Sequence, residues 1–521
     1  MKTEKTIPVV IGVIAETAVS EKDRDAVYKA VRNELKRLQS AFPASPFILL
    51  GDPGTEAVRL CAAAAQEIGI RLLAALPYSK ETYAERLSAA DRESFLSCCS
   101  EAEDVFPVTY TEKVPEDGIT DAYLLRQRDL YIASRSHVVL VIRENTDTDA
   151  KAYFRCSPVS GMPARTENNT EVIVVAASSE SSSAAGTVQY YGNSEAVMDI
   201  LKKTDDFNRM AQAAARKDRY RLPEGAEKDP KVLRLEQVSV AAGDLSSANA
   251  RRYRRVLVLL AAAGTLLTFS FLMYDEAEAI GLIFACGIML VCSWLISRYA
   301  ERSGCHDKYI GYRALAECTR VQMYLRYAGT DLQAADLLSW TQQDETAWIM
   351  CALYALGAGS PPDASYDVRS CWVEEQRAYH EWAAKRAKRD HAISENTVST
   401  ALVFSVLLYI AAVLFEILSG GMFIAPVIAV RDVGLYRTAL KIVLGTISAV
   451  TLFTANYYGK LSLPRLLSDH RKMERFYSRV SSQITECGQT EELLKLLARE
   501  ELIENANWCS YQRDNKPDIN I

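Results

Sequence analysis

Hydrophobic and polar residues follow two different patterns along this chain of 521 residues. Up to about residue 210, short apolar runs alternate with amphipathic stretches, which is typical of strands alternating with helices. Beyond residue 250, four apolar runs continue for 17 residues or more, and charged stretches separate them. The two patterns predict an α/β domain followed by a helical region that crosses a membrane.

Five short apolar runs in the first pattern are bounded by turn-forming or polar residues and predict strands. They are residues 7–15, 47–51, 70–77, 136–142 and 171–176. After the first run, Ser20 and Asp23 resemble a capping box, and the next apolar residues share one helical face. That face comprises Val27, Val31, Leu35 and Leu38. With an alanine-rich helix before Gly69 and a closing helix at 193–211, these elements predict a doubly wound, Rossmann-like domain over residues 1–211.

The stretch GDPGTE, residues 51–56, joins the second predicted strand to the alanine-rich helix. Strand, tight loop and helix in this order place backbone N–H groups and a helix N-terminus where a phosphate can bind. The same residues also suit a simple turn, because aspartate caps helices well and proline is favoured at their first position. The local sequence leaves both interpretations open.

The four long apolar runs predict membrane spans at about residues 256–274, 279–297, 400–418 and 439–458. Each is about long enough for a hydrocarbon core of roughly 30 Å. A buried core helix can also reach this length, but such helices usually carry a polar stripe. The run VLVLLAAAGTLLTFSFLMY shows none.

Basic residues flank one end of each predicted span. RRYRR at 251–255 precedes the first span and KRAKR at 385–389 precedes the third, while Arg298 and Lys460 follow the second and fourth. Lys and Arg collect on the cytoplasmic side of membrane proteins, so the pattern predicts a multi-pass inner-membrane protein with both termini cytoplasmic. Within the membrane domain, 251–521, cytoplasmic helices are then expected at 300–395 and 460–513. Residues 212–250 are a linker that we expect to be partly ordered against those helices.

Composition narrows the possible partners. The chain has 60 basic and 66 acidic residues, so it lacks the basic excess of a general nucleic-acid binder. Its twelve cysteines form no C-x-x-C pair and its five histidines are dispersed, so we expect a reduced compartment and no metal site.

Four segments of the N-terminal domain together resemble the SLOG family, Rossmann-like relatives of the cytokinin-activating LOG enzymes. They are the GDPGTE loop, the segment EIGIRLLAALP, Tyr83 shortly after it, and SRSHVVLVI at a later strand. The resemblance covers about 200 residues and implies that the domain senses or processes a nucleotide-derived ligand. It implies no other cofactor.

The same resemblance implies which residues line the ligand site. The glycine loop would face the ligand's phosphate and an acidic residue its ribose, which gives Gly12, Glu16, Gly51, Asp52, Gly54, Thr55 and Glu56 as candidates. Asp52 and Glu56 would repel a phosphate, so sugar hydroxyls or base donors suit them better. The family's Gly-Gly-Thr loop is replaced by RENTDTD at 143–149. Candidates to replace its phosphate contacts are Arg59, Arg126 and Arg128.

The second half resembles the SLATT family of bacterial transmembrane effectors. The resemblance rests on four separated blocks: YRALAECTRVQMYLRYAG (312–329), the helix around Trp348, CWVEEQRAYHEWAAKRAKR (371–389) and LLKLLAREELIENANWCSYQR (493–513). Such effectors are often encoded with SLOG sensors and are thought to form pores that end cell growth during phage infection. The resemblance therefore implies an ion channel or pore in antiphage defence.

Polar residues within the spans are the candidates for a pore lining, because burying them in lipid is costly. Thr265 and Thr268 can bond to their own helix backbone, whereas Glu416 lies near the end of its span. Its carboxylate either reaches the membrane interface or forms a ring at a pore mouth. Four helices from one chain pack into a filled bundle, so a pore requires a homo-oligomer.

Three classes of function stay open at this point. The first is a ligand-gated membrane effector. The second is a membrane-tethered LOG-type hydrolase, although Pro53-Gly54-Thr55-Glu56 lacks a glycine of the expected catalytic loop and Arg59 stands where a glutamate is expected. The third is a scaffold without catalysis. The sequence favours the effector and predicts that the protein is not an enzyme.

Overall fold

The structure, a computed structural model, describes residues 5–110, 112, 114–116, 118–146, 153, 166–178, 184–214, 222–276, 279–338, 346–418, 432–461 and 463–514. The chain divides into two compact units. The sheet unit comprises Met1–Leu245, Gly311–Trp372 and Cys487–Trp508. The span unit comprises Ser246–Ile310, Val373–Glu486 and Cys509–Ile521. Each is described by itself below.

The sheet unit is built on one sheet of seven strands in the order β4-β3-β2-β1-β5-β6-β7. The strands are β1 (Val9–Ala15), β2 (Phe47–Gly51), β3 (Arg71–Leu76), β4 (Asp104–Pro107), β5 (Val138–Arg143), β6 (Glu171–Ala176) and β7 (Val188–Tyr191). All neighbours pair in parallel except β6 and β7, which pair antiparallel. The predicted α/β domain is therefore confirmed as a mostly parallel, Rossmann-like sheet.

All five predicted strands are present, because each is an apolar run that is buried on both faces, as parallel strands usually are. The sequence analysis did not predict β4 and β7. Each has four residues and is only partly buried, and both form edges of the sheet. Short, half-exposed edge strands carry too little hydrophobic signal to stand out in a sequence.

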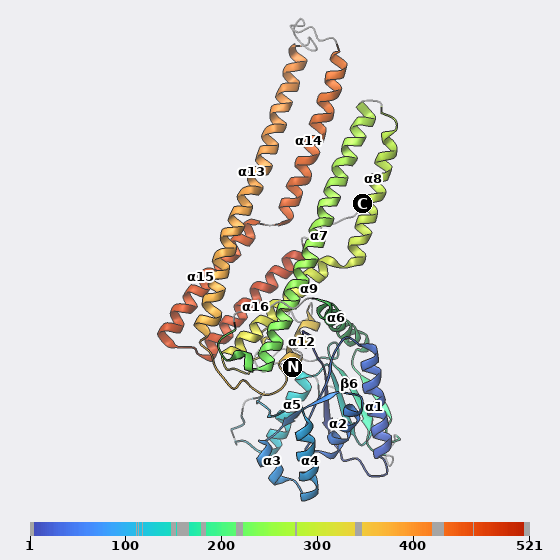
Figure 1. Ribbon diagram of the computed structural model, residues 1–521, viewed down its shortest axis with the longest axis vertical. Helices are drawn as coiled ribbons and strands as arrows, with labels where there is room; N and C mark the ends of the chain where they lie inside the picture. The colour runs from blue at the N-terminus through green and yellow to red at the C-terminus, as the bar shows by residue number, and fades with distance from the viewer. Residues whose placement is uncertain are drawn as a thin grey trace. The chain divides into compact units, whose positions relative to one another are not determined.

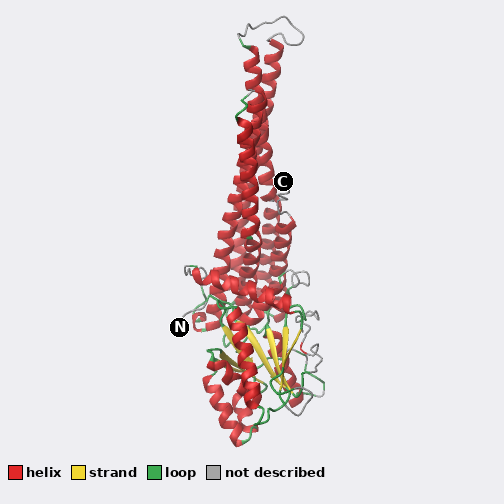
Figure 2. Cartoon of the chain, turned by 90° about the vertical axis from the view of Figure 1, so that its right-hand side faces the viewer, coloured by secondary structure: helices red, strands yellow, loops and turns green. Residues whose placement is uncertain are grey.

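Helices cover both faces of the sheet (Figure 2). One face packs against α1 (Arg24–Ala41), α2 (Glu56–Glu67) and α6 (Ser194–Ala213). The buried side chains of α1 are the predicted set Val27, Val31, Leu35 and Leu38. The other face packs against α5 (Asp121–Arg135) and α12 (Ala347–Leu356). Every residue of α12 except its first, Ala347, is buried, so a segment far along the chain completes the core of this unit.

Further helices complete the sheet unit. They are α3 (Lys80–Arg86), α4 (Ala89–Glu101), η2 (Ala226–Lys228), α10 (Ala334–Leu337) and parts of α7 (Pro230–Glu276), α9 (Cys305–Tyr327) and α16 (Glu491–Asp514). Arg320 of α9 pairs with Glu501 of α16 (Nη2 to Oε1, 2.8 Å). The indole of the fully buried Trp372 donates to the second oxygen of Glu501 (2.8 Å). Residues 487–508 are thereby held inside this unit.

The predicted linker 212–250 is largely helical where the structure describes it. Residues 215–221 lie outside the described ranges, and from Pro230 onward the segment is the first part of α7, a single helix of 47 residues. Ser239 of α7 donates to the Ala316 carbonyl of α9 (2.9 Å). This part of the linker is thus ordered against another helix.

The span unit contains the long apolar helices. Its elements are the later part of α7, α8 (Leu282–Ser303), the π-helical turn η3 (Arg369–Val373, with its last residue in this unit), α13 (Glu374–Leu418), α14 (Val433–Leu461) and α15 (Leu463–Cys487). Helices α7, α8, α13 and α14 are long and apolar enough to cross a membrane and contain nearly all of the predicted spans. The prediction of four spans is confirmed to this extent. Residues 419–431 between α13 and α14 lie outside the description.

Two glycines allow α7 and α14 to pack closely. A Cβ at Gly264 would lie 2.5 Å from the ring of Phe453, and one at Gly445 would lie 2.6 Å from Leu272. Cys286 of α8 lies 3.9 Å from the Leu267 carbonyl of α7, and α13 packs against α14 (Figure 1). The packing order α8, α7, α14, α13 follows from these contacts.

Candidate functional site

The direction of strand order in the sheet reverses at β1, which makes the carboxyl ends of β1 and β5 the topological switch point. In open sheets of this kind, ligands bind outside the carboxyl ends of the strands at this place. The residues that end these two strands are Glu16, which directly follows β1, and Arg143, the last residue of β5. We call these two residues and Tyr153 the switch-point cluster.

The cluster combines charged and aromatic groups. Nε of Arg143 lies 3.1 Å from Oε2 of Glu16, and the two side chains are 35% and 37% exposed. The Tyr153 hydroxyl donates to Oε1 of Glu16. Burial, and then the bond to Glu16, raise the pKa of this hydroxyl. The cluster therefore offers a guanidinium, a carboxylate and a ring, of which the two charges are reachable from solvent.

A hydroxyl near the switch-point cluster in sequence has no partner. Thr17 follows Glu16, and its Oγ1 is buried without a hydrogen-bond partner among the described residues. Buried polar groups in proteins are normally hydrogen-bonded, so this hydroxyl is an exception in the described part of the chain.

Asp52, in the predicted ligand loop, is buried and bonded on both of its oxygens. Oδ2 lies 2.5 Å from Nη1 of Arg128 and accepts from the Tyr83 hydroxyl (2.9 Å), while Oδ1 accepts from the N–H of Gly54 (2.8 Å). Asp52 is 2% exposed. This carboxylate anchors the loop and is not free to bind a sugar.

The remaining loop residues also bond within the loop. Arg59 donates to the carbonyls of Pro53 (3.0 Å) and Gly54 (3.1 Å), and the backbone N–H of Thr55 donates to the Asp52 carbonyl (3.3 Å). A Cβ at Gly54 would overlap the Tyr83 ring, so only glycine fits there. The backbone N–H groups of residues 54 and 55 therefore donate within the loop. This agrees with the interpretation of GDPGTE as a simple turn.

The predicted site residues fall into three places. Asp52, Gly54, Thr55, Arg59 and Arg128 meet in one loop, and Glu16 lies in the switch-point cluster. Three others lie elsewhere. Gly12 is mid-strand and close to Ser136, Glu56 forms an exposed pair with Arg24 (3.4 Å), and Arg126 forms a bidentate pair with Glu112. Gly51 ends β2 and packs against Val58 of α2.

Asp129 lies beside the loop. Nη2 of Arg128 lies 2.9 Å from Oδ1 of Asp129, and the charge of Asp129 is the smallest of the causes that act on the pKa of Tyr153.

Sequence reasoning overlooked Arg143 and Tyr153. Arg143 directly follows the predicted strand 136–142, so the rule that selected Glu16 after the first strand would also have selected it. Tyr153 has no comparable signal, because its contact with Glu16 joins residues 137 positions apart.

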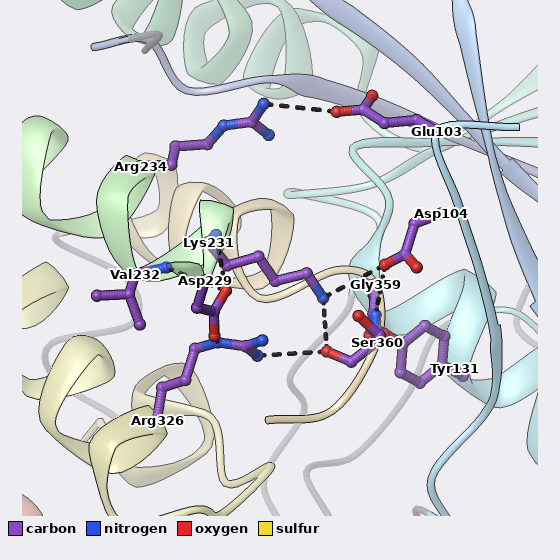
Figure 3. Close-up of polar contacts among 10 residues, drawn as sticks. All are labelled: Glu103, Asp104, Tyr131, Asp229, Lys231, Val232, Arg234, Arg326, Gly359 and Ser360. Atoms are coloured by element: carbon purple, nitrogen blue, oxygen red, sulfur yellow. Dashed lines mark hydrogen bonds and ion pairs between the residues drawn. The ribbon is translucent and has the colours of Figure 1, made fainter. Parts of the chain in front are cut away.

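A second set of buried charges lies where β4 meets three helical segments, and we call it the Lys231 cluster (Figure 3). Nζ of Lys231, in the first turn of α7, donates to the Ser360 carbonyl (2.7 Å) and lies 3.8 Å from Asp104 of β4. Arg326 of α9 donates to the same carbonyl (3.3 Å) and pairs with Asp229 (2.5 Å). Asp229 also accepts the Lys231 N–H (2.9 Å) and caps α7.

The surroundings of Lys231 change its acidity. Burial, followed by the positive charge of Arg326, lowers the pKa of Lys231 to about 7. Asp104 opposes this shift but lies too far away to cancel it. A titratable amine is thereby built into the first turn of α7.

The polar residues predicted for a pore lining are paired. The hydroxyls of Thr265 and Thr268 donate to the carbonyls of Ala261 (3.0 Å) and Gly264 (2.9 Å) on their own helix. Glu416 receives two bonds from Arg437 of α14 (2.6 and 2.5 Å). Both partners of this pair are exposed in a single chain.

Within the described ranges, no three His, Cys, Asp or Glu side chains are grouped so that they could hold a metal ion. The chain matches no protein-family model, no curated protein and no solved structure.

Proposed function

We propose that this protein is a ligand-gated membrane effector. Its sheet unit binds a nucleotide-derived small molecule at the strand ends, and its span unit forms a pore as a homo-oligomer. The termini lie on the cytoplasmic side of a bacterial inner membrane, as the basic flanks of the spans favour. The likeness to SLOG and SLATT proteins supports a role in antiphage defence.

The observation that carries this proposal is the continuity of α7. One helix begins in the Lys231 cluster of the sheet unit and continues as the first apolar span. It belongs to the sheet unit up to Leu245 and to the span unit from Ser246. An unbroken helix transmits a displacement of its first turn along its length, which a flexible linker does not.

The candidate site suits a polar, anionic ligand. Arg143 provides a reachable guanidinium for a phosphate, and Glu16 beside it accepts hydrogen bonds from sugar hydroxyls. To move a closed population from 1:99 to 99:1, the ligand must favour the open state by about 5.5 kcal/mol, which several sites of an oligomer can share.

An oligomer is favoured by the exposure of the spans. In a single chain, none of the apolar window of α13 and at most 17% of any other window is buried. The four helices of one chain therefore enclose little of their own surface, and a pore must be lined by several copies.

The ligand site is tested by what the purified full-length protein retains. Detergent-solubilised protein is incubated with a panel of nucleotides, and the retained molecules are identified by mass spectrometry. Arg143→Met is expected to lose retention at least tenfold. The matched control is Arg71→Met, which removes a more exposed arginine (47% against 35%) paired with Glu103 (3.2 Å) at the opposite strand ends. Equal retention by both variants contradicts the proposed site.

Pore formation is tested by ion flux from dye-loaded liposomes that hold the full-length chain. Flux is expected to rise only when a retained nucleotide is added. Chemical change of the nucleotide without flux would favour the LOG-type hydrolase instead, and retention without flux or turnover would favour a scaffold.

A further inference from the structure

Two buried histidines meet between α13 and α15 in the span unit. Nδ1 of His380 lies 3.0 Å from Nδ1 of His470, and the residues are 4% and 5% exposed. The ring of Tyr477 stacks on His380 (5.6 Å between centroids), and Tyr379 meets His470 edge-on (6.2 Å). We call His380 and His470 the histidine pair.

The histidine pair lies on segments that flank the hairpin formed by the apolar helices α13 and α14. His380 precedes the apolar part of α13, and His470 follows the end of α14 by a few residues. Helices α13 and α14 also pack against each other. The pair therefore joins the segments that lead into and out of the hairpin, 20 residues before the predicted span at 400 and nine residues after Leu461.

The Nδ1-to-Nδ1 bond depends on the number of protons. One ring must donate a proton from Nδ1 and the other must accept it with a free lone pair. This holds when both rings are neutral and when the pair carries one excess proton. When both rings are protonated, two N–H groups face each other across 3.0 Å and no acceptor is left. The protons are lost in two coupled steps that belong to the pair.

Charged groups beside the pair come from both helices. On α13, Arg377 pairs with Glu374 (2.8 Å) and Lys385 with Glu381 (2.7 Å). On α15, the charge of Glu474 acts on Arg377 and Lys385. A second contact also joins the helices, because Ser481 of α15 donates to Glu374 (2.6 Å).

We propose that the histidine pair is a proton-operated latch, which holds α13 to α15 until both imidazoles are protonated and then releases them. Free imidazole titrates near pH 6.5, so the test compares the protein at one pH above and one pH below that value. The latch acts on the span unit independently of any ligand in the sheet unit.

The test is hydrogen exchange of the full-length protein in nanodiscs with EDTA, followed by mass spectrometry. Exchange of peptides from 374–390 and 463–487 is compared at pH 7.5 and 5.0 after correction for intrinsic rates. Wild type is expected to lose at least tenfold in protection at pH 5.0. Peptides of β2 and β6 report whether the rest of the protein stays folded.

Variants assign the response to the pair. His380→Gln and His470→Gln keep a polar side chain that cannot be charged, so each is expected to abolish the difference between pH 7.5 and 5.0. The control is His391→Gln on the same helix, which removes a partly exposed histidine beside Glu395 (3.5 Å) and should respond as wild type does. Unchanged protection of wild type at pH 5.0, or a full response in both pair variants, overturns the proposal. Neither result depends on ligand or flux.

Discussion

In the candidate site, the burial of an arginine side chain determines whether it can bind a ligand. Arg128 is a candidate for phosphate binding in the sequence, but in the structure it is 7% exposed and its charge is used by Asp52 and Asp129. Arg143, four residues before the loop segment that the description leaves out, is also paired, with Glu16, but its side chain is 35% exposed. Burial therefore separates an anchoring arginine from one that a ligand can reach.

Removing Arg128 should destabilise the sheet unit strongly. Arg128→Met leaves the buried carboxylate of Asp52 without its cation, which typically costs about 3–5 kcal/mol. Arg126→Met, two residues away, breaks only an exposed pair with Glu112 and should cost at most about 1 kcal/mol. Pulse proteolysis of the full-length chain in increasing urea measures both, and equal losses would contradict the anchoring role.

The sequence predicted those features whose signal is local. The strands 47–51 and 171–176 are apolar runs that needed no partner to be recognised, and the buried face of α1 follows from helical spacing. Asp52 and Arg128 are 76 positions apart, so the sequence around either residue does not predict that they pair. The glycine loop could therefore be located from the sequence, but its closure onto itself could not.

At the level of helices and strands, burial patterns leave partners undetermined. The sequence of the apolar helix α12 does not indicate which face of the sheet it covers. Strand β4 is short and half-exposed, so its sequence does not predict a strand. The four spans were recognisable because length and hydropathy suffice for them. Their mutual packing was not, since it depends on the position of Gly264 and Gly445 against large side chains of the other helix.

Enlarging these glycines should loosen the contact between α7 and α14. Gly264→Ile places side-chain atoms where the ring of Phe453 lies, and overpacking of this kind typically costs about 1–3 kcal/mol. A Cβ added at Gly287 of α8 meets no atom within 4 Å, so Gly287→Ile is the matched control. Unfolding in mixed micelles of rising SDS fraction compares the two, and an unaffected Gly264→Ile protein would contradict this packing.

At the scale of the whole molecule, two groups in the sheet unit titrate near neutrality. The pKa of Lys231 is lowered to about 7 and that of Glu504, mainly by burial, is raised to about 7. Between pH 7 and 10.5 the unfolded chain binds more protons at Lys231, so stability rises with pH there. Between pH 4.5 and 7 the folded chain binds more protons at Glu504, so stability falls with rising pH.

The sheet unit should therefore be least stable near pH 7, with slopes of up to about 1.4 kcal/mol per pH unit on either side. Lys231→Met should flatten the curve between pH 7 and 9, and Glu504→Gln should flatten it between pH 5 and 7. Pulse proteolysis across this range measures each limb separately. A curve of unchanged shape in both variants would show that other groups control it.

The orientation of the chain in the membrane is open to direct measurement. Four spans would return the chain to its starting side, and the basic flanks of the spans predict that this side is the cytoplasm. Reporter fusions at residues 1 and 521 should both score cytoplasmic. A split result would contradict the number of spans, and two external reporters would contradict the orientation.

The sheet unit is assembled from three separate segments of the chain, so it can be completed only late in translation. Its last segment, residues 487–508, leaves the ribosome only after all four apolar helices have been translated and passed to the insertion machinery. Until Glu501 emerges, Arg320 and the indole of Trp372 lack the partner that they contact in the finished protein. At typical elongation rates this wait lasts on the order of tens of seconds. A translation product cut short before residue 487 would therefore contain all four apolar helices but lack the segment that completes the sheet unit.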